Sequence, residues 1–119
     1  MSDEVTPVSV LMGEIRRFAE VRGWEPYHSP KNLVMALASE VGELCDLFRW
    51  LTPEESREIV RDPARRKAVA DEIADVANIV LLLSMHAGID MTTAIREKMV
   101  DNAKKYPAPV AGAEIGLPS

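Results

Sequence analysis

Helix-start signals divide most of this 119-residue chain into helices and constrain its fold more than any other feature. Proline repeatedly follows a residue suited to capping, and each such pair predicts a helix with proline in its first turn. These pairs are Thr6-Pro7, Ser29-Pro30, Thr52-Pro53 and Asp62-Pro63. Signals for β-strands are almost absent. We therefore predict helices at about 7–22, 30–50, 53–60, 63–87 and 91–105.

Four of these segments are long and have short connections, which is typical of an antiparallel bundle. Segments 30–50 and 63–87 are the most apolar, so we expect them to be the central pair. The chain is 47% hydrophobic, which is more than four helices of this length bury among themselves. We predict an all-α, antiparallel four-helix-bundle-like domain over residues 1–106 that oligomerises through helical faces, followed by a Pro/Gly-rich tail at 107–119.

The charge and the apolar pattern exclude several classes of partner. A net charge of −5 argues against a nucleic-acid polymer or an anionic membrane as the partner, because both are usually met by a basic face. The acidic N-terminus has no apolar signal segment, and the apolar stretch around Ile79–Leu83 is too short to span a bilayer. The single cysteine, Cys45, excludes an internal disulfide. We expect a cytoplasmic protein without a membrane partner.

Two apolar helical stripes are each interrupted by a pair of acids. Glu40 and Glu43 share one stripe with Ala36, Leu47 and Trp50. Glu72 and Asp75 share the other with Ala68, Ile79 and Leu82. The pairs form the pattern Glu-x2-Glu-x28-Glu-x2-Asp, and an antiparallel hairpin of the two helices would bring all four carboxylates to one place.

Four carboxylates in a half-buried apolar setting need a compensating cation. Oxygen-only ligation favours Mg2+, with Mn2+ as a substitute. The alternative is that all four are ordinary solvated acids. That explanation would have to apply independently to two acid pairs, each on an apolar helix. A di-iron bundle is disfavoured because no Glu-x-x-His pair is present, and His28 and His86 both lie near helix ends. There is also no nucleophile elbow and no Gly-rich phosphate loop.

Polar residues of the last predicted helix complete the set of candidates. Lys98, Asn102 and Lys105 follow i, i+4, i+7 spacing, so that two ammonium groups and an amide could grip phosphate or sugar oxygens. A solvated basic face near a helix C-terminus is an equally good explanation. Trp50 lies on the first acid stripe and could stack on a planar group beside a metal.

Three stretches together resemble a known family: FAEVRGWEPYHSPKNLVMALASEVGELCDLFRW, DEIADVANIVLLL and KMVDNAKKYP. They are similar to the MazG-like all-α nucleoside triphosphate pyrophosphohydrolases, and within that group to the dCTP pyrophosphatases. The resemblance implies Mg2+-dependent hydrolysis of a dNTP between the α and β phosphates, for nucleotide-pool sanitation, by a homodimer or a dimer of dimers. It implies metal ligation by Glu40, Glu43, Glu72 and Asp75.

The resemblance also suggests which residues contact the nucleotide. Lys98, Asn102 and Lys105 match the closing motif, and Trp24 and Trp50 match aromatic positions of the base pocket. His28, Lys31 and Asn32 match a His-x-Pro-(Arg/Lys)-Asn segment. Ile79 stands where the animal enzymes carry tyrosine and Ile15 where they carry histidine, so polar groups near the base are lost. Ser39 stands immediately before Glu40, at a position where MazG proper tends to carry Glu. A catalytically silent helical oligomerisation or regulatory module is the alternative.

Overall fold

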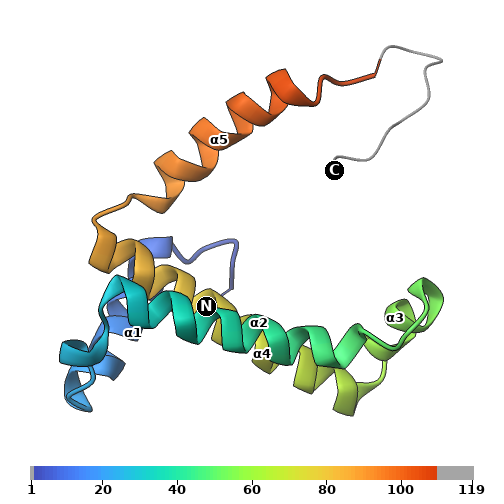
Figure 1. Ribbon diagram of the computed structural model, residues 1–119, viewed down its shortest axis with the longest axis horizontal. Helices are drawn as coiled ribbons and strands as arrows, with labels where there is room; N and C mark the ends of the chain where they lie inside the picture. The colour runs from blue at the N-terminus through green and yellow to red at the C-terminus, as the bar shows by residue number, and fades with distance from the viewer. Residues whose placement is uncertain (1, 110–119) are drawn as a thin grey trace. The chain divides into compact units, whose positions relative to one another are not determined.

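The structure is a computed structural model that describes residues 2–109, and all regular secondary structure within that range is helical (Figure 1). The elements are α1 (Val8–Val21), a 3-10 turn η1 (Glu25–Tyr27), α2 (Pro30–Phe48), α3 (Pro53–Ile59), α4 (Pro63–Ala87) and α5 (Met91–Lys105). The prediction of an all-α protein is confirmed, and each predicted helix is present with ends that differ by no more than two residues.

Side-chain caps explain where most helices begin. At the start of α3 the Thr52 hydroxyl accepts a hydrogen bond from the Glu55 amide at 3.1 Å, and the Glu55 carboxylate accepts one from the Thr52 amide at 2.9 Å. This reciprocal pair is a capping box. Ser29 and Asp62 cap α2 and α4 through the amide three residues on, and Asp90 caps α5 in the same way.

Two helix ends differ from the sequence-based expectation. Pro7 is itself the N-cap of α1 and not its first helical residue, and no side chain caps that end. α2 ends at Phe48, because a turn closed by a hydrogen bond from the Leu51 amide to the Phe48 carbonyl begins there. Trp50 therefore lies beyond the helix. Gly88 ends α4 with a φ of 67°, a left-handed conformation that glycine adopts without steric cost.

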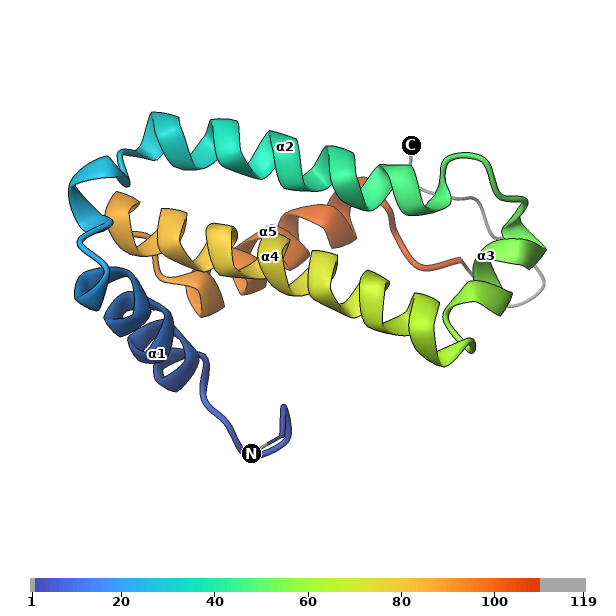
Figure 2. The ribbon, with the colours of Figure 1, turned by 90° about the horizontal axis from the view of Figure 1, so that it is seen from below.

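Residues up to 88 form one compact unit, in which α2 and α4 make the main helix contact. The two helices run antiparallel along most of their length, joined through α3, and α1 packs against α4 (Figure 2). The two segments predicted to pair are thus the main helix pair of this unit, and a central place for them in a four-helix bundle stays a prediction. The buried apolar residues described in the structure are Ala19, Leu33, Ile59 and Val69, so the core of the single chain is small.

Residues 89–109 belong to a second unit, which contains α5. The participation of α5 in a four-helix bundle, and a single domain over 1–106, therefore stay predictions. The predicted tail begins at 107, and residues 110–119 lie outside the described residues.

Large apolar side chains stay exposed on the central helices. Val34, Met35 and Val41 of α2 and Ile73 of α4 each expose 41% or more of their surface. Side chains of this kind are usually withdrawn from water in an assembly. Oligomerisation through helical faces stays a prediction, and these residues are where we expect it. In the described part of the chain, no helix combines the length and apolar character needed to cross a bilayer.

Candidate active site

The antiparallel pair of α2 and α4 brings the two acid pairs together. One carboxylate oxygen from each of Glu40, Glu43 and Glu72 lies within 4.8 Å of the others. Asp75 is not part of this trio, but its charge contributes to the raised pKa of both Glu40 and Glu72. The helical register therefore places three acids in one cluster and the fourth close enough to act on it electrostatically.

Two oxygens of the cluster are buried without a hydrogen-bond partner. They are Oε2 of Glu40 and Oε2 of Glu72. The interaction with the neighbouring Glu43 carboxyl, followed by burial, raises the pKa of Glu40 to about 7. Burial is the main cause that raises the pKa of Glu72 above its ordinary range. The cluster thus holds negative charge that the protein itself does not compensate.

The donor set fits a hard divalent cation. The ligands available are carboxylate oxygens, and the unpartnered oxygens of Glu40 and Glu72 are placed to receive one. In the described structure no lysine or arginine forms an ion pair with any of the four acids. A cation is therefore the compensating group that this geometry favours.

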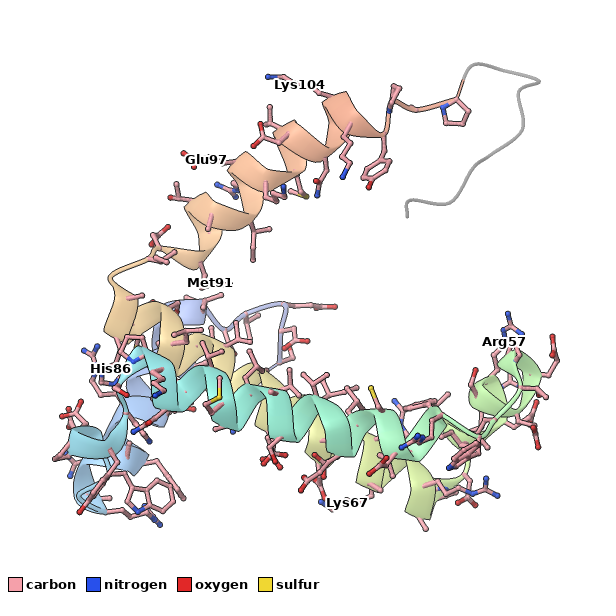
Figure 3. The ribbon with its side chains drawn as sticks, in the orientation of Figure 1. Arg57, Lys67, His86, Met91, Glu97 and Lys104 are labelled. Carbon is pink, nitrogen blue, oxygen red and sulfur yellow. The ribbon has the colours of Figure 1, made fainter. Side chains whose placement is uncertain are left out.

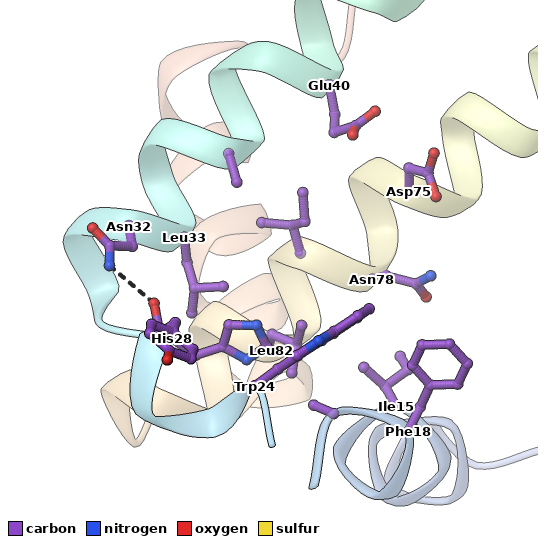
Figure 4. Close-up of a pocket in the computed structure, with 14 residues that line it drawn as sticks. Ile15, Phe18, Trp24, His28, Asn32, Leu33, Glu40, Asp75, Asn78 and Leu82 are labelled. Atoms are coloured by element: carbon purple, nitrogen blue, oxygen red, sulfur yellow. Dashed lines mark hydrogen bonds between the residues drawn. The ribbon is translucent and has the colours of Figure 1, made fainter. Parts of the chain in front are cut away.

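A cavity of about 600 Å³ begins at the acids and extends between α1, α2 and α4 (Figure 4). Glu40 and Asp75 line it at one end. Away from the acids the wall is mainly apolar and aromatic, formed by Ile15, Phe18, Ala19, Trp24, Tyr27, Leu33, Ala36, Ile79 and Leu82. A volume of this size is within the usual range for small-molecule sites.

Four residues predicted to contact a nucleotide line this cavity: Trp24, His28, Asn32 and Ile79. Trp24 lies edge-to-face against Phe18, with ring centroids 5.7 Å apart. Nδ1 of His28 is buried without a hydrogen-bond partner, so a ligand atom could satisfy it. Asn32 instead donates its amide to the Tyr27 carbonyl at 2.9 Å, which fixes the turn before α2. Ile15, which like Ile79 differs from the residue that the family resemblance predicts, also lines the wall.

Two further predicted residues, Trp50 and Lys31, are not among the residues described as lining the cavity. Trp50 is 82% exposed, and its ring lies 4.9 Å from the Arg49 guanidinium carbon. The expectation that Trp50 continues the acid stripe is wrong, because α2 ends two residues before it. Lys31 is exposed at the start of α2. His86 is exposed, with its ring 5.9 Å from that of His28.

The basic residues of α5 belong to the second unit. Lys98 and Asn102 share a shallow hollow on that helix with Ile95 and Met99, as their spacing predicts. Lys105 places its Nζ 5.2 Å from the centroid of the Tyr106 ring. Figure 3 shows the side chains of α5 along both its faces. That these residues reach the nucleotide stays a prediction.

Sequence reasoning did not single out Phe18, Tyr27 and Asn78, which also line the cavity. Asn78 could have been predicted from the sequence, because it lies three residues after Asp75 and so one turn further along the same face of α4. Phe18 and Tyr27 were not, because their place depends on how α1 and η1 pack against the central helices.

Comparison with known proteins agrees with this fold. The sequence pattern of the MazG-like family matches residues 35–114, which is more than half of the chain. The chain belongs to the MazG-like family. It is 39% identical to human dCTP pyrophosphatase 1 over 102 residues, covering 82% of this chain and 60% of the human protein. It is 38% identical to mouse dCTP pyrophosphatase 1 over 98 residues, covering 79% of this chain and 58% of that protein.

The chain spans about three fifths of the length of these curated relatives. A solved structure matches it over nearly all of both molecules. The crystal structure of a pyrophosphatase from Archaeoglobus fulgidus has a TM-score of 0.80 and 35% sequence identity, and the match covers 91% of this chain and 99% of that one. The helical architecture is therefore shared with a pyrophosphatase.

Proposed function

We propose that this protein is a Mg2+-dependent nucleoside triphosphate pyrophosphatase that hydrolyses dCTP-like or modified dNTPs to the monophosphate and pyrophosphate. The reaction breaks the bond between the α and β phosphates and consumes one water. The observation that carries the proposal is the carboxylate cluster of Glu40, Glu43 and Glu72 at the end of a cavity large enough for a nucleoside. The similarity to dCTP pyrophosphatases and to a solved pyrophosphatase supports it.

In this proposal the acids hold Mg2+, with Mn2+ as a substitute. Glu40, Glu43 and Glu72 would supply the ligands of the cluster, and Asp75 would complete them from the next turn of α4. When bound, the cation would neutralise phosphate charge and lower the pKa of a nearby water. The packing of α2 against α4 would hold the carboxylates in place before substrate arrives, which would lower the reorganisation needed during reaction.

The cavity would hold the nucleoside. Trp24 offers an aromatic surface for a base, and Ile15, Ile79 and Leu82 would give the base apolar contacts. His28 offers its buried, unpartnered Nδ1 to a polar atom of the ligand. Lys98, Asn102 and Lys105 would contact phosphate or sugar oxygens through charge-assisted hydrogen bonds. We assign Lys31 and Trp50 to substrate binding on family resemblance alone.

We further propose a homodimer or a dimer of dimers in the cytoplasm. The exposed apolar residues of α2 and α4 support assembly, and sedimentation at micromolar concentration tests it. A monomer at that concentration would contradict it. The unpaired Cys45 is compatible with a reducing compartment.

A substrate panel tests the proposed reaction. Purified protein is incubated with each dNTP and NTP in the presence of Mg2+, and monophosphate and pyrophosphate are measured by chromatography. We expect both products in equal amounts for at least one pyrimidine dNTP, and none when the cation is chelated. Release of inorganic phosphate from the γ position, or no product with any nucleotide, would refute the proposal.

A further inference from the structure

Asn78 is a polar residue of the cavity wall that has no role in the chemistry above. It lies on α4, three residues after Asp75 and directly before Ile79. Besides the main cavity it lines a neighbouring hollow of about 270 Å³ with Glu14, Ile15 and Phe18 of α1. Figure 4 shows Asn78 between Asp75 and the α1 residues Ile15 and Phe18. It therefore lies where the acidic end of the cavity passes into its apolar part.

The side-chain amide of Asn78 is not engaged by the protein. The described residues provide no hydrogen bond to it, whereas the other amide in the wall, that of Asn32, is held by the Tyr27 carbonyl. Its neighbours in the two hollows include the apolar Ile15, Phe18 and Ile79 and the acids Glu14 and Asp75. Neither acid forms a hydrogen bond with it in the described structure. Asn78 is exposed at the edge of the cavity, and an amide that no protein group engages there can hydrogen-bond a ligand.

The position of Asn78 along α4 indicates which part of a nucleotide it would meet. A rise of about 1.5 Å per residue puts it about 4.5 Å beyond Asp75, in the direction of Leu82. A triphosphate held at the acids directs the nucleoside into the cavity past this point. We propose that the amide of Asn78 hydrogen-bonds the edge of a pyrimidine base and accepts cytosine and the 4-oxo pyrimidines, uracil and thymine, alike. This inference rests on the proposed function and deepens it.

The chemistry of an amide explains the dual acceptance. Cytosine presents an amino donor at C4 beside the acceptor N3, whereas thymine and uracil present an acceptor O4 beside an N3–H donor. The Asn78 side chain carries one carbonyl acceptor and one NH2 donor, and a half-turn about its last torsion exchanges them. Because no protein group holds the amide, both orientations are available to it. Ile15 and Ile79 add contact area without favouring either base.

Two variants test this assignment through kcat/KM for dCTP and dTTP. In the wild-type protein we expect the two values to lie within about tenfold of each other. Asn78→Asp leaves only acceptors, which favour the amino group of cytosine and repel O4, so the dCTP to dTTP ratio should rise by about 10- to 100-fold. Asn78→Leu keeps the size of the side chain without its polar atoms, and should lower both values by about tenfold while leaving their ratio unchanged.

Ala77→Asp is the matched control, because it adds the same charge to an exposed neighbouring position outside the described cavity wall. Its dCTP to dTTP ratio should equal that of the wild type. A wild-type ratio above about 100, or an unchanged ratio in Asn78→Asp, would overturn the inference. The inference would also be overturned if Asn78→Leu changed the ratio of kcat/KM for dCTP to that for CTP without lowering kcat/KM for dCTP and dTTP. Asn78 would then contact the sugar.

Binding separates this inference from the proposed function. If no dNTP is hydrolysed, the proposed function fails, and the base contact is judged by calorimetry with α,β-imido analogues of dCTP and dTTP in the presence of Mg2+. Similar affinities for the two analogues, with a preference for the cytosine analogue in Asn78→Asp, support the assignment. Affinities that differ by more than about 100-fold, or that the substitution leaves unchanged, refute it.

Discussion

Binding of Mg2+ or Mn2+ to the carboxylate cluster should release protons, and the number released should follow the pKa of Glu40. A carboxyl with a pKa of about 7 is half protonated at pH 7, whereas one at the ordinary value of 4.5 carries a proton in about one molecule in three hundred. The cation binds the deprotonated form. Glu40 alone should therefore release about 0.9 proton at pH 6, about 0.5 at pH 7 and about 0.1 at pH 8.

Titration calorimetry measures this number directly. At each pH the cation is titrated into the protein in two buffers that differ in ionisation enthalpy, and the difference in heat gives the protons released. Glu72 adds to the release, because its pKa is also raised. The total should thus equal or exceed the values for Glu40 and fall steadily with rising pH, and cation affinity should weaken below pH 7.

Glu40→Gln and Asp46→Asn complete the test. The first substitution removes the titrating group and should reduce the release at pH 6 by roughly one proton. The second removes an exposed carboxylate on the same helix that pairs with Arg49, outside the cluster, and should change nothing. Heats that are independent of the buffer at pH 6, or equal proton release in the wild type and Glu40→Gln, would refute the reasoning about the cluster.

Further expectations concern the site, the cap and the pH dependence of stability. Glu43→Gln and Asp75→Asn should each lower kcat/KM by about 100-fold or more with unchanged far-ultraviolet circular dichroism; near wild-type turnover in both would remove these residues from the site. Trp24→Ala should raise KM for dNTPs by roughly tenfold through lost stacking, and an unchanged KM would place the base elsewhere. Thr52→Ala removes the side-chain acceptor of the α3 capping box. The free energy of unfolding should therefore fall by about 1 kcal/mol and Tm by about 4 °C, without loss of turnover. Without a divalent cation, Tm should fall as pH rises from 5 to 8, because the raised pKa values of Glu40 and Glu72 make the folded state bind more protons than the unfolded chain. Differential scanning fluorimetry measures this slope. Glu72→Gln should flatten the slope, and Asp71→Asn should leave it unchanged.

Helix positions and the meeting of the acid pairs could be predicted because both depend on local rules. Cap and proline chemistry specifies where α2, α3 and α4 begin, and a three-residue spacing puts two carboxylates on one face of a helix. An antiparallel connection then requires the two faces to meet. No tertiary information beyond the direction of the hairpin is needed for this step.

The cavity wall was less predictable, because it is assembled from segments whose packing the local pattern does not encode. Phe18 and Tyr27 reach the cavity through the packing of α1 and the turn η1. Trp50 was misplaced because its spacing continues the stripe of α2, although the backbone leaves the helix at Phe48. Side-chain periodicity carries information only as far as the helix extends.

The connection through α3 can change in length without changing the geometry of the site. It joins α2 and α4 at the end of the pair opposite η1, and its own ends are fixed by the capping box at Thr52 and by the Asp62 cap (Figure 2). Residues added between Phe48 and Pro63 leave the register of the acids unchanged, because each acid pair is set by its own helix. A residue added within α2 between Leu33 and Glu40 instead turns the carboxylates by about 100° relative to the cavity wall. The hairpin end is therefore the place where this scaffold can gain segments, or be cut and rejoined, during evolution or engineering.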